Sequence, residues 1–580
     1  MNENNAVNAP TQAGAAPSSP LGDAAQPPAE VFLPANTDFA SSSFTRVPRA
    51  AALGEVLSPG QELTLAVPAG SRYSAQLVVR AAAQLHALRV HVSAAAPVNA
   101  AGVENAVPAS VAAPAAPRVR ARFVGYVPDL SNPGQEVADQ LLESPALPVA
   151  AGENQPVWLT VEVPERAGPG LYWVSLRLEA DGQEVASYTL AVTVPQLRFR
   201  PPAQRPFLLD MWIHPDPVAR FLDVEPWSPG HLAALEPYWR EQASAGQGVV
   251  NLAVVEDPWL VELEGAIAAQ TESPYRSTVQ WRFDGEQWSF DYTVFDRLVE
   301  QARACGVGRR IHAFAPLQFK ALDRLYYVNA AGQGVSVPME ITDARYRAAW
   351  IAFLRDFKTH LEEKGWFEDT SLAFDEQPAQ RMEEAFSFVR EADPAWEPKI
   401  ALAANTLAEA DLANYISFNY TFLDQVPQEL IERRRRAGEP TLFYTWNEPV
   451  KPNTVVQTPP FNARLIGWVV RQRNLDGYLR WSFNSWPADV YTQPAFLYDQ
   501  GDEYVVYPGP AGPLSSIRWE TFKDGLEDAE LLDLAAQRLG GEHAAVRQAL
   551  TQVDAQAPES RENFAALLAH RAALLAALTD

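Results

Sequence analysis

The hydrophobic pattern changes near residue 200, and this change constrains the fold more than any other feature of the 580-residue chain. From about residue 31 to 198, apolar and polar residues alternate in short runs that Pro and Gly interrupt. Successive side chains of a β-strand point to opposite faces of its sheet, so a period of two is typical of half-buried antiparallel strands. About seven such runs predict a β-sandwich: E-L-T-L-A-V, Y-S-A-Q-L-V-V-R, A-L-R-V-H-V, V-R-A-R-F-V-G-Y-V, W-L-T-V-E-V, L-Y-W-V-S-L-R-L and Y-T-L-A-V-T-V.

Strand-like runs alternate with longer amphipathic segments after the Pro-rich linker F-R-P-P-A-Q-R-P at 199–206. The strand candidates are 207–212, 248–255, 309–316, 371–375, 399–404, 414–420, 441–446 and 476–483. Helices are predicted between them, at 229–245, 293–305, 344–363, 380–391, 427–436 and 462–473. Eight β/α repeats over about 300 residues are typical of a (β/α)8 barrel of the TIM type.

The predicted chain is therefore a multidomain protein of the β plus α/β class. An Ala- and Pro-rich tail at 1–30 has too few large apolar residues to order itself. We expect an N-terminal antiparallel β-sandwich at 31–200, the (β/α)8 barrel at 201–516, and C-terminal helices packed on the barrel at 517–580.

Charge and hydropathy argue against several classes of partner. The net charge of −25 disfavours nucleic acid and anionic membranes, because both require a basic face. The basic run Arg433 to Arg436 ends an amphipathic segment, where cations favour the helix dipole. No run of about eighteen apolar residues predicts a membrane span. Residues 1–30 lack the pattern of a signal peptide, so the default expectation is a cytoplasmic protein, with export open if the N-terminus is incomplete.

Cysteine and histidine give no indication of a disulfide, metal or cofactor. Cys305 is the only cysteine, and its context L-V-E-Q-A-R-A-C-G-V indicates a core thiol at a helix end. The eight His residues show none of the spacings typical of zinc sites.

The segment L-A-F-D-E-Q-P at 372–378 is the strongest candidate for chemistry. A short apolar run ends in Asp375 and Glu376, so a buried strand would deliver two carboxyl groups to a loop. Two like charges so close should raise the pKa of one of them, and a proton donor beside an anion suits acid-catalysed cleavage of a glycosidic bond. Alternatively, the pair could simply cap the helix predicted after it.

Polar and aromatic residues follow the other predicted barrel strands, at the ends where barrel enzymes place their active sites. The candidates for substrate binding are His214, Asp257, Trp259, Asn405, Tyr420, Tyr444, Trp446, Asn447, Trp481, Asn484 and Trp486. Aromatic faces stack on sugar C–H patches and amides bind hydroxyls, so this rim predicts a carbohydrate site.

The chain resembles glycoside hydrolase family 123, the β-N-acetylgalactosaminidases and the uncharacterised proteins that share their catalytic domain. The segments that carry the likeness are V-A-R-F-L-D-V-E-P-W-S, V-V-E-D-P-W, H-L-E-E-K-G-W-F, L-A-F-D-E-Q-P, L-F-Y-T-W-N-E-P, D-G-Y-L-R-W-S-F-N-S-W and Y-P-G-P-A-G-P-L-S-S-I-R-W-E-T-F-K-D-G-L-E-D-A-E-L-L. They span the predicted barrel and the start of the C-terminal helices, and the resemblance implies a β-sandwich ahead of them.

The resemblance implies a retaining exo-hydrolase that releases terminal β-linked N-acetylgalactosamine by substrate-assisted catalysis through an oxazoline intermediate. In that scheme the acetamido oxygen of the substrate attacks C1, Glu376 is the general acid and base, and Asp375 orients the acetamido group. Tyr444 or Tyr420 would hold the acetamido oxygen. Gln377 departs from the pattern, because many relatives carry Arg there. Arg518 and Glu520 are interpreted as a structural ion pair.

Two alternatives stay open from the sequence. Glu448 in N-E-P at 447–449 could form a conventional acid–nucleophile pair with Glu376, although that motif normally follows strand four rather than strand seven. The barrel could also be an inactive carbohydrate-binding protein. The galacto or gluco configuration of the sugar and the oligomeric state stay open as well.

Overall fold

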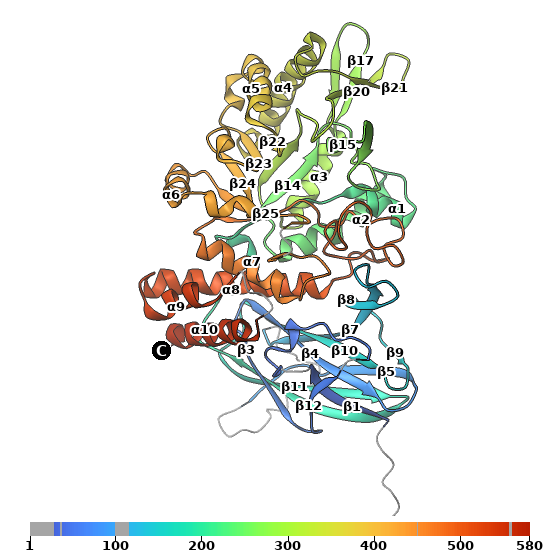
Figure 1. Cartoon of the computed structure of the whole chain (residues 1–580), viewed down its shortest axis with the longest axis vertical. Helices are drawn as coiled ribbons and strands as arrows, with labels where there is room; N and C mark the ends of the chain where they lie inside the picture. The colour runs from blue at the N-terminus through green and yellow to red at the C-terminus, as the bar shows by residue number, and fades with distance from the viewer. Residues whose placement is uncertain are drawn as a thin grey trace, which may run out of the picture.

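The computed structural model describes residues 28–34, 37–50, 52–98, 115–448, 451–555 and 560–579. The tail predicted at 1–30 lies outside the described residues as far as residue 27. Figure 1 shows two bodies stacked along the long axis, a β-sandwich at one end and a barrel with its helices at the other. The C-terminal helices lie where the two bodies meet.

The N-terminal body is a sandwich of two sheets, as predicted. Its strands are β1 Ala29–Pro34, β2 Leu53–Val56, β3 Glu62–Ala66, β4 Ser71–Ala81, β5 Leu85–Val92, β6 Ala96–Pro97, β7 Arg118–Pro128, β8 Glu136–Leu142, β9 Leu147–Val149, β10 Asn154–Val163, β11 Gly170–Ala180 and β12 Gln183–Val194. One sheet has the order β2-β1-β4-β10-β7-β8 and the other β3-β12-β11-β5-β9, with β6 beside β11. All described pairs are antiparallel except β12 with β3. The two inner faces enclose one apolar core.

The C-terminal body contains the predicted barrel of parallel strands. These are β13 Leu208–Met211, β14 Val249–Ala253, β19 Arg310–Phe314, β22 Thr370–Asp375, β23 Ile400–Ala404, β24 Tyr415–Asn419, β25 Thr441–Thr445 and β26 Gly477–Arg480. They form an 8-stranded sheet in the order β13-β26-β25-β24-β23-β22-β19-β14. A parallel bridge between Leu209 and Gln247 joins the two edge strands and closes the barrel.

The helices around the barrel begin and end close to the predicted positions. The predicted ones are α2 Pro229–Ser244, α3 Thr293–Ala304, α4 Ala344–Lys364, α5 Ala379–Ala392, α6 Gln428–Ala437 and α7 Phe461–Gln472. One further short helix, α1 Pro215–Leu222, follows β13 and was not predicted. Ser228 and Asp343 cap α2 and α4 through side-chain oxygens, which satisfies backbone N–H groups that a helix start leaves unpaired. The chain ends with α8 Ile517–Leu539, α9 Ala544–Gln552 and α10 Arg561–Thr579.

Two insertions on the barrel were not predicted from the sequence. The hairpin of β15 Leu260–Leu263 and β16 Ala266–Ala269 follows β14. A 4-stranded sheet combines β17 Gln280–Phe283 and β18 Trp288–Asp291 with β20 Arg324–Asn329 and β21 Gly334–Pro338. Both grow from connections at the carboxyl ends of strands, so they shape the face where barrel enzymes bind substrate.

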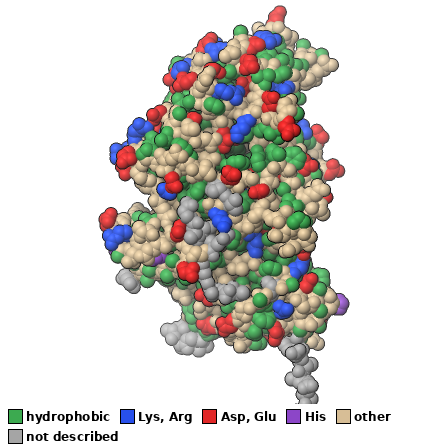
Figure 2. Space-filling model, viewed as in Figure 1, with side chains coloured by type: hydrophobic (Ala, Val, Ile, Leu, Met, Phe, Trp, Pro, Cys, Tyr) green, Lys and Arg blue, Asp and Glu red, His purple; other side chains and the backbone are tan. Residues whose placement is uncertain are grey.

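The surface carries charged side chains of both signs (Figure 2). On the face that Figure 2 shows, Lys and Arg side chains are scattered among Asp and Glu side chains. In the described part of the chain, no helix combines the length and the apolar composition that a membrane span requires.

Candidate active site

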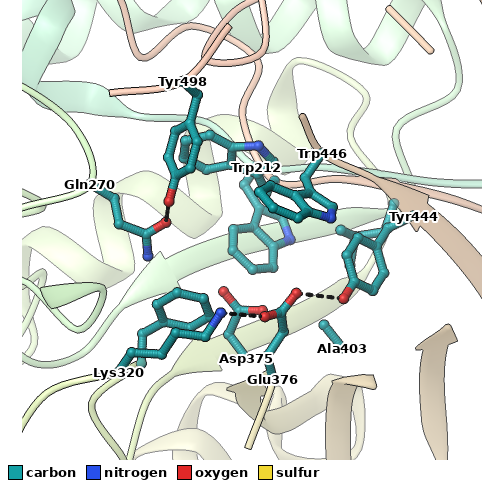
Figure 3. Close-up of a pocket in the computed structure, with 12 residues that line it drawn as sticks. Trp212, Gln270, Lys320, Asp375, Glu376, Ala403, Tyr444, Trp446 and Tyr498 are labelled. Carbon is teal, nitrogen blue, oxygen red and sulfur yellow. Dashed lines mark hydrogen bonds and ion pairs between the residues drawn. The ribbon is translucent and has the colours of Figure 1, made fainter. Parts of the chain in front are cut away.

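A pocket lies at the carboxyl ends of the barrel strands. A largely aromatic lining with a few polar groups is typical of small-molecule sites. The lining residues are Trp212, Gln270, Phe319, Lys320, Asp375, Glu376, Ala403, Tyr444, Trp446, Leu479, Trp481 and Tyr498. Figure 3 shows the two carboxyl groups side by side below the aromatic rings.

The backbone at the end of β22 turns both carboxyl groups into this pocket. The apolar residues Leu372 to Phe374 are buried in the barrel, and the strand ends at Asp375. Glu376 has a φ of +48°, a left-handed conformation that is unfavourable for a residue with a side chain and is enriched at functional sites. The next helix starts at Ala379 with Pro378 at its N-cap and no side-chain cap. The pair therefore does not serve as a helix cap.

Asp375 holds its proton more tightly than an ordinary aspartic acid. Its Oδ2 accepts a hydrogen bond from Trp259 Nε1 at 3.0 Å, and the residue is partly buried. Burial first, and then the charge of Glu376, raise the pKa of Asp375 to about 8. The prediction that one acid of the pair has a raised pKa therefore falls on Asp375.

Glu376 has a different set of partners. Its Oε1 accepts the hydroxyl of Tyr444 at 2.6 Å, and its Oε2 lies 2.8 Å from Lys320 Nζ. The two donors approach from opposite sides in Figure 3. The Tyr444 hydroxyl also lies 3.0 Å from Asn405 Oδ1 and 3.3 Å from Asn419 Nδ2. Because a hydroxyl has one proton, Tyr444 can donate to Glu376 or to Asn405, but not to both.

Three aromatic rings form the wall above the carboxyl groups. The centroid of Tyr498 is 6.3 Å from that of Trp446 and 5.3 Å from that of Trp481, both in edge-on arrangements. Trp481 Nε1 donates to Asp502 at 3.0 Å, and the Tyr498 hydroxyl donates to Gln270 at 2.6 Å. These bonds hold the rings in place while their faces remain available for a ligand.

The structure brings together most of the residues predicted for the site. Asp375, Glu376, Tyr444, Trp446 and Trp481 line the pocket. Trp259 and Asn405 lie behind the lining residues. Trp259 bonds to Asp375, and Asn405 bonds to Tyr444.

The other predicted residues do not line the pocket: His214, Asp257, Tyr420, Asn447, Asn484 and Trp486. The His214 ring stacks on Tyr275 at 3.5 Å, and burial lowers the pKa of His214 to about 3. Asn484 bonds to the backbone of His214, and Trp486 donates to a backbone carbonyl in the core. These side chains support the barrel rim from behind.

Asn447 and Asp257 also lie outside the pocket lining. Asn447 accepts the backbone N–H of Asp499 at 2.8 Å and so ties two rim loops together. Burial raises the pKa of Asp257 to about 7. Glu448, the alternative partner of Glu376, has an exposed side chain and is not among the lining residues.

Sequence reasoning missed the lining residues that come from long connections. Lys320 and Phe319 follow β19, Gln270 follows β16, and Tyr498 belongs to the segment between β26 and α8. They lie well beyond the ends of the barrel strands β14, β19 and β26, so the pattern of the barrel strands contained no signal for them. Within the described residues, no group of His, Cys, Asp and Glu side chains could hold a metal ion.

Comparison with known proteins found one family. The family model described as glycoside hydrolase 123, catalytic domain, matches residues 212–535. A solved family 123 glycoside hydrolase from Clostridium perfringens has a TM-score of 0.78 and 17% identity, with 95% of this chain and 97% of that chain covered. At this identity the likeness shows that the two proteins share a fold.

More distant structures share less. A family 39 glycoside hydrolase from Bacteroides cellulosilyticus WH2 has a TM-score of 0.33 and 10% identity, covering 70% of this chain and 78% of that chain. A Bacteroides ovatus GH5 xyloglucanase has a TM-score of 0.28 and 8% identity, covering 80% of this chain and 98% of that chain. No curated protein sequence matches the chain.

Proposed function

The chain belongs to glycoside hydrolase family 123, and from this premise we propose that it releases terminal β-linked N-acetylgalactosamine with retention of configuration. It is a glycoside hydrolase and acts on a carbohydrate. The proposal adds the sugar and the mechanism, in which the acetamido group of the substrate is the nucleophile. Its main support is the unequal pair at the end of β22, Asp375 with a raised pKa and Glu376 beside it.

The two carboxyl groups suit this reaction because they act on different parts of the substrate. Glu376 donates a proton to the glycosidic oxygen while the acetamido oxygen attacks C1, so the C1–O bond breaks as a ring forms. Asp375 accepts the acetamido N–H and stabilises the positive charge of the oxazolinium intermediate. Glu376, now ionised, removes a proton from water, which attacks C1 and restores the acetamido group. Two attacks at C1 retain the configuration.

The position of the proton in the free enzyme determines what substrate binding must change before the first step. Because its pKa is raised, Asp375 is protonated in the free enzyme near neutral pH. Catalysis requires the reverse, a protonated Glu376 beside an ionised Asp375. A substrate N–H that bonds to Asp375 favours its ionised form and so favours transfer of the proton to Glu376.

Tyr444 suits the role of binding the acetamido oxygen, because its hydroxyl is the neutral donor closest to the carboxyl groups of Asp375 and Glu376. In the free enzyme it bonds to Glu376 at 2.6 Å. We assign it, rather than Tyr420, to the acetamido oxygen, since Tyr420 is not among the residues that line the pocket. The solved Clostridium perfringens relative was studied for glycolipid glycan hydrolysis, and a terminal sugar of a glycan is a substrate of the class proposed here.

The test is hydrolysis of aryl N-acetyl-β-galactosaminide and N-acetyl-β-glucosaminide by wild type, Glu376→Gln and Asp375→Asn. General acid–base groups contribute about 10²–10⁴-fold, so both variants should lose turnover on that scale. For Glu376→Gln the loss should shrink with a dinitrophenyl leaving group, which needs little protonation. A thiazoline analogue of the intermediate should inhibit the wild type strongly.

Controls separate the competing schemes. Glu448→Gln should keep wild-type activity, because Glu448 does not line the pocket. Labelling of Glu448 by a 2-fluoro glycoside, or full activity of Asp375→Asn, would contradict the substrate-assisted mechanism. Binding of N-acetylhexosamines without release of any aryl group would instead favour an inactive carbohydrate-binding protein.

A further inference from the structure

Lys320 is the only cation among the described residues that line the pocket. Its backbone is fixed to the inserted hairpin, because Lys320 N donates to Leu260 O at 3.1 Å and Lys320 O accepts from Glu262 N at 3.0 Å. The side chain is 56% exposed, and its ammonium lies 4.2 Å from the centroid of the Phe319 ring. The backbone is thus anchored while the charged end can move.

The ammonium occupies a position that the proposed reaction needs for the substrate. As the general acid, Glu376 must reach the glycosidic oxygen, and in the free enzyme its Oε2 lies 2.8 Å from Lys320 Nζ. An ammonium is a donor only and stabilises an ionised carboxylate, whereas the general acid must carry a proton. Lys320 therefore has to leave Glu376 when substrate binds, on the side where the leaving group sits.

The protein offers Lys320 no alternative acid within the pocket. Asp375 and Glu376 are the only acidic residues in the described lining, and both are occupied in the reaction. A neutral leaving group would leave the ammonium without an anionic partner in the pocket. An anionic leaving group would replace Glu376 as the partner.

Arg381, a second nearby cation, is not available to bind an anion of the substrate. Arg381 donates to both carboxylate oxygens of Asp323, at 2.8 and 2.7 Å, and to Gln377 at 2.9 Å. These bonds leave the Arg381 guanidinium engaged in the protein. Lys320 is therefore the group that can respond to the charge of a ligand.

We propose that Lys320 binds a carboxylate or sulfate on the sugar that is released, so that the preferred substrates are N-acetylhexosamines β-linked to an acidic sugar. This inference rests on the proposed function and names the leaving group for the same site. Transfer of the ammonium from Glu376 to the substrate anion allows Glu376 to take up the proton that catalysis requires.

The test uses disaccharides that differ only in the charge of the leaving sugar. The same N-acetylhexosamine is linked to glucuronic acid, to neutral glucuronamide, to glucose, or to glucose 6-sulfate. For the wild type we expect kcat/KM for the glucuronate substrate, the sulfate substrate or both to exceed that of the neutral ones by about tenfold, an effect of a close charge pair. The carboxylate and sulfate arms identify which anion is preferred.

Lys320→Met should reduce this ratio to about one, whereas Lys399→Met should leave it unchanged. Lys399 is a matched control, because it lies 3.0 Å from Glu368 and 4.7 Å from the Phe367 ring but not in the pocket. A nitrophenyl N-acetylhexosaminide carries no anion for Lys320 to bind, so its rate corrects each protein for folding and chemistry before the anion preferences are compared.

If the wild type prefers neither the glucuronate nor the sulfate substrate over the neutral ones, or if an anion preference survives in Lys320→Met, the proposed role of Lys320 is overturned while the proposed function stands. Failure of the wild type to cleave the nitrophenyl substrate would overturn the proposed function and, with it, this inference. Added salt should weaken the preference in the wild type and leave Lys320→Met unaffected, since screening acts on exposed charges.

Discussion

Asp375 and Glu376 are neighbours in sequence but differ in their surroundings, and this difference lets one proton serve two carboxyl groups. Asp375 faces an indole N–H and the barrel interior, and Glu376 faces a hydroxyl and an ammonium. The left-handed backbone at Glu376 aims the second carboxyl into the same pocket as the first. In an ordinary strand, adjacent side chains would point to opposite faces.

A buried carboxyl group with a raised pKa makes folding stability depend on pH. The folded state keeps the Asp375 proton up to about pH 8, whereas an unfolded aspartic acid loses it near pH 4. The stabilisation is therefore complete below about pH 4 and is lost as the pH rises through about 8. Asp375→Asn cannot ionise and so avoids this loss of stability at high pH. The variant should therefore melt roughly 2–4 °C above the wild type at pH 8.

The difference in Tm should shrink towards pH 5, which thermal unfolding at several pH values would measure. Glu448→Gln, at an exposed position, should give a difference that does not change with pH. A lower Tm for Asp375→Asn than for the wild type at pH 8 would show that Lys320 and Trp259 hold Asp375 ionised, contrary to the assignment made here.

The Tyr444 hydroxyl is predicted to act in the reaction itself. Tyr444→Phe keeps the ring and removes the hydroxyl that we assign to the acetamido oxygen, on which charge develops in the reaction. Hydrogen bonds to charged groups contribute about 1.5–3 kcal/mol, so we expect kcat to fall about 10–100-fold. Tyr420→Phe is the matched control, because Tyr420 does not line the pocket, and it should stay within about twofold of the wild type. Similar losses in both variants would argue against a specific role for Tyr444.

At the scale of elements, the barrel strands were predictable because each is a short apolar run between longer amphipathic segments. The end of β22 therefore identified Asp375, and the end of β25 identified Tyr444. Lys320 and Tyr498 were not predictable, because hydrophobic periodicity gives no position within a long connection. His214 was misleading for a related reason: it follows a strand, but α1 begins at the next residue and holds its side chain away from the pocket.

The connection between β26 and α8 depends on Glu503 for its shape. This side chain is buried and accepts the backbone N–H groups of Phe496 at 3.1 Å and Leu497 at 3.4 Å, next to Tyr498 in the pocket. Glu503→Ala leaves both donors without their partner, so the Tyr498 segment should loosen. We expect KM to rise about three- to tenfold with kcat within about twofold, because the change affects binding more than chemistry.

Glu503→Gln tests whether the shape or the charge of this side chain matters. Burial raises the pKa of Glu503 to about 8, so the group is neutral below that pH and an amide of the same shape should restore a wild-type KM. Initial-rate kinetics at pH 6–7 would measure both variants. A Gln variant as impaired as the Ala variant would contradict this account.

At the scale of the whole molecule, α8 connects the sandwich to the barrel. It packs against α7 of the barrel and against β4 and β8 of the sandwich. At the crossing of α7 and α8, a Cβ on Gly467 would lie 2.2 Å from the carbonyl oxygen of Gly525, so the contact requires glycine. Figure 1 shows α8 spanning the boundary between the two bodies.

The charged residues of α8 illustrate what sequence could and could not establish. Arg518 and Glu520 were interpreted as structural, and both are buried away from the pocket. They do not pair with each other, however: Arg518 bonds to Asp139, and Glu520 pairs with Arg72. Both partners belong to the sandwich, and a pairing between distant domains leaves no pattern along a single sequence.

The Asp139–Arg518 pair should stabilise the whole molecule far more than a surface pair does. Asp139 accepts from Arg518 at 3.0 Å, from Arg46 at 3.1 Å and from Tyr507 at 2.7 Å, all out of solvent. Asp139→Ala would leave a guanidinium buried without its carboxylate, which costs about 3–5 kcal/mol. Glu143→Ala, which breaks an exposed pair with Arg120, should cost at most about 1 kcal/mol. Urea unfolding followed by Trp fluorescence measures both. Equal midpoints for the two variants would mean that the sandwich and the barrel are stable independently of this contact.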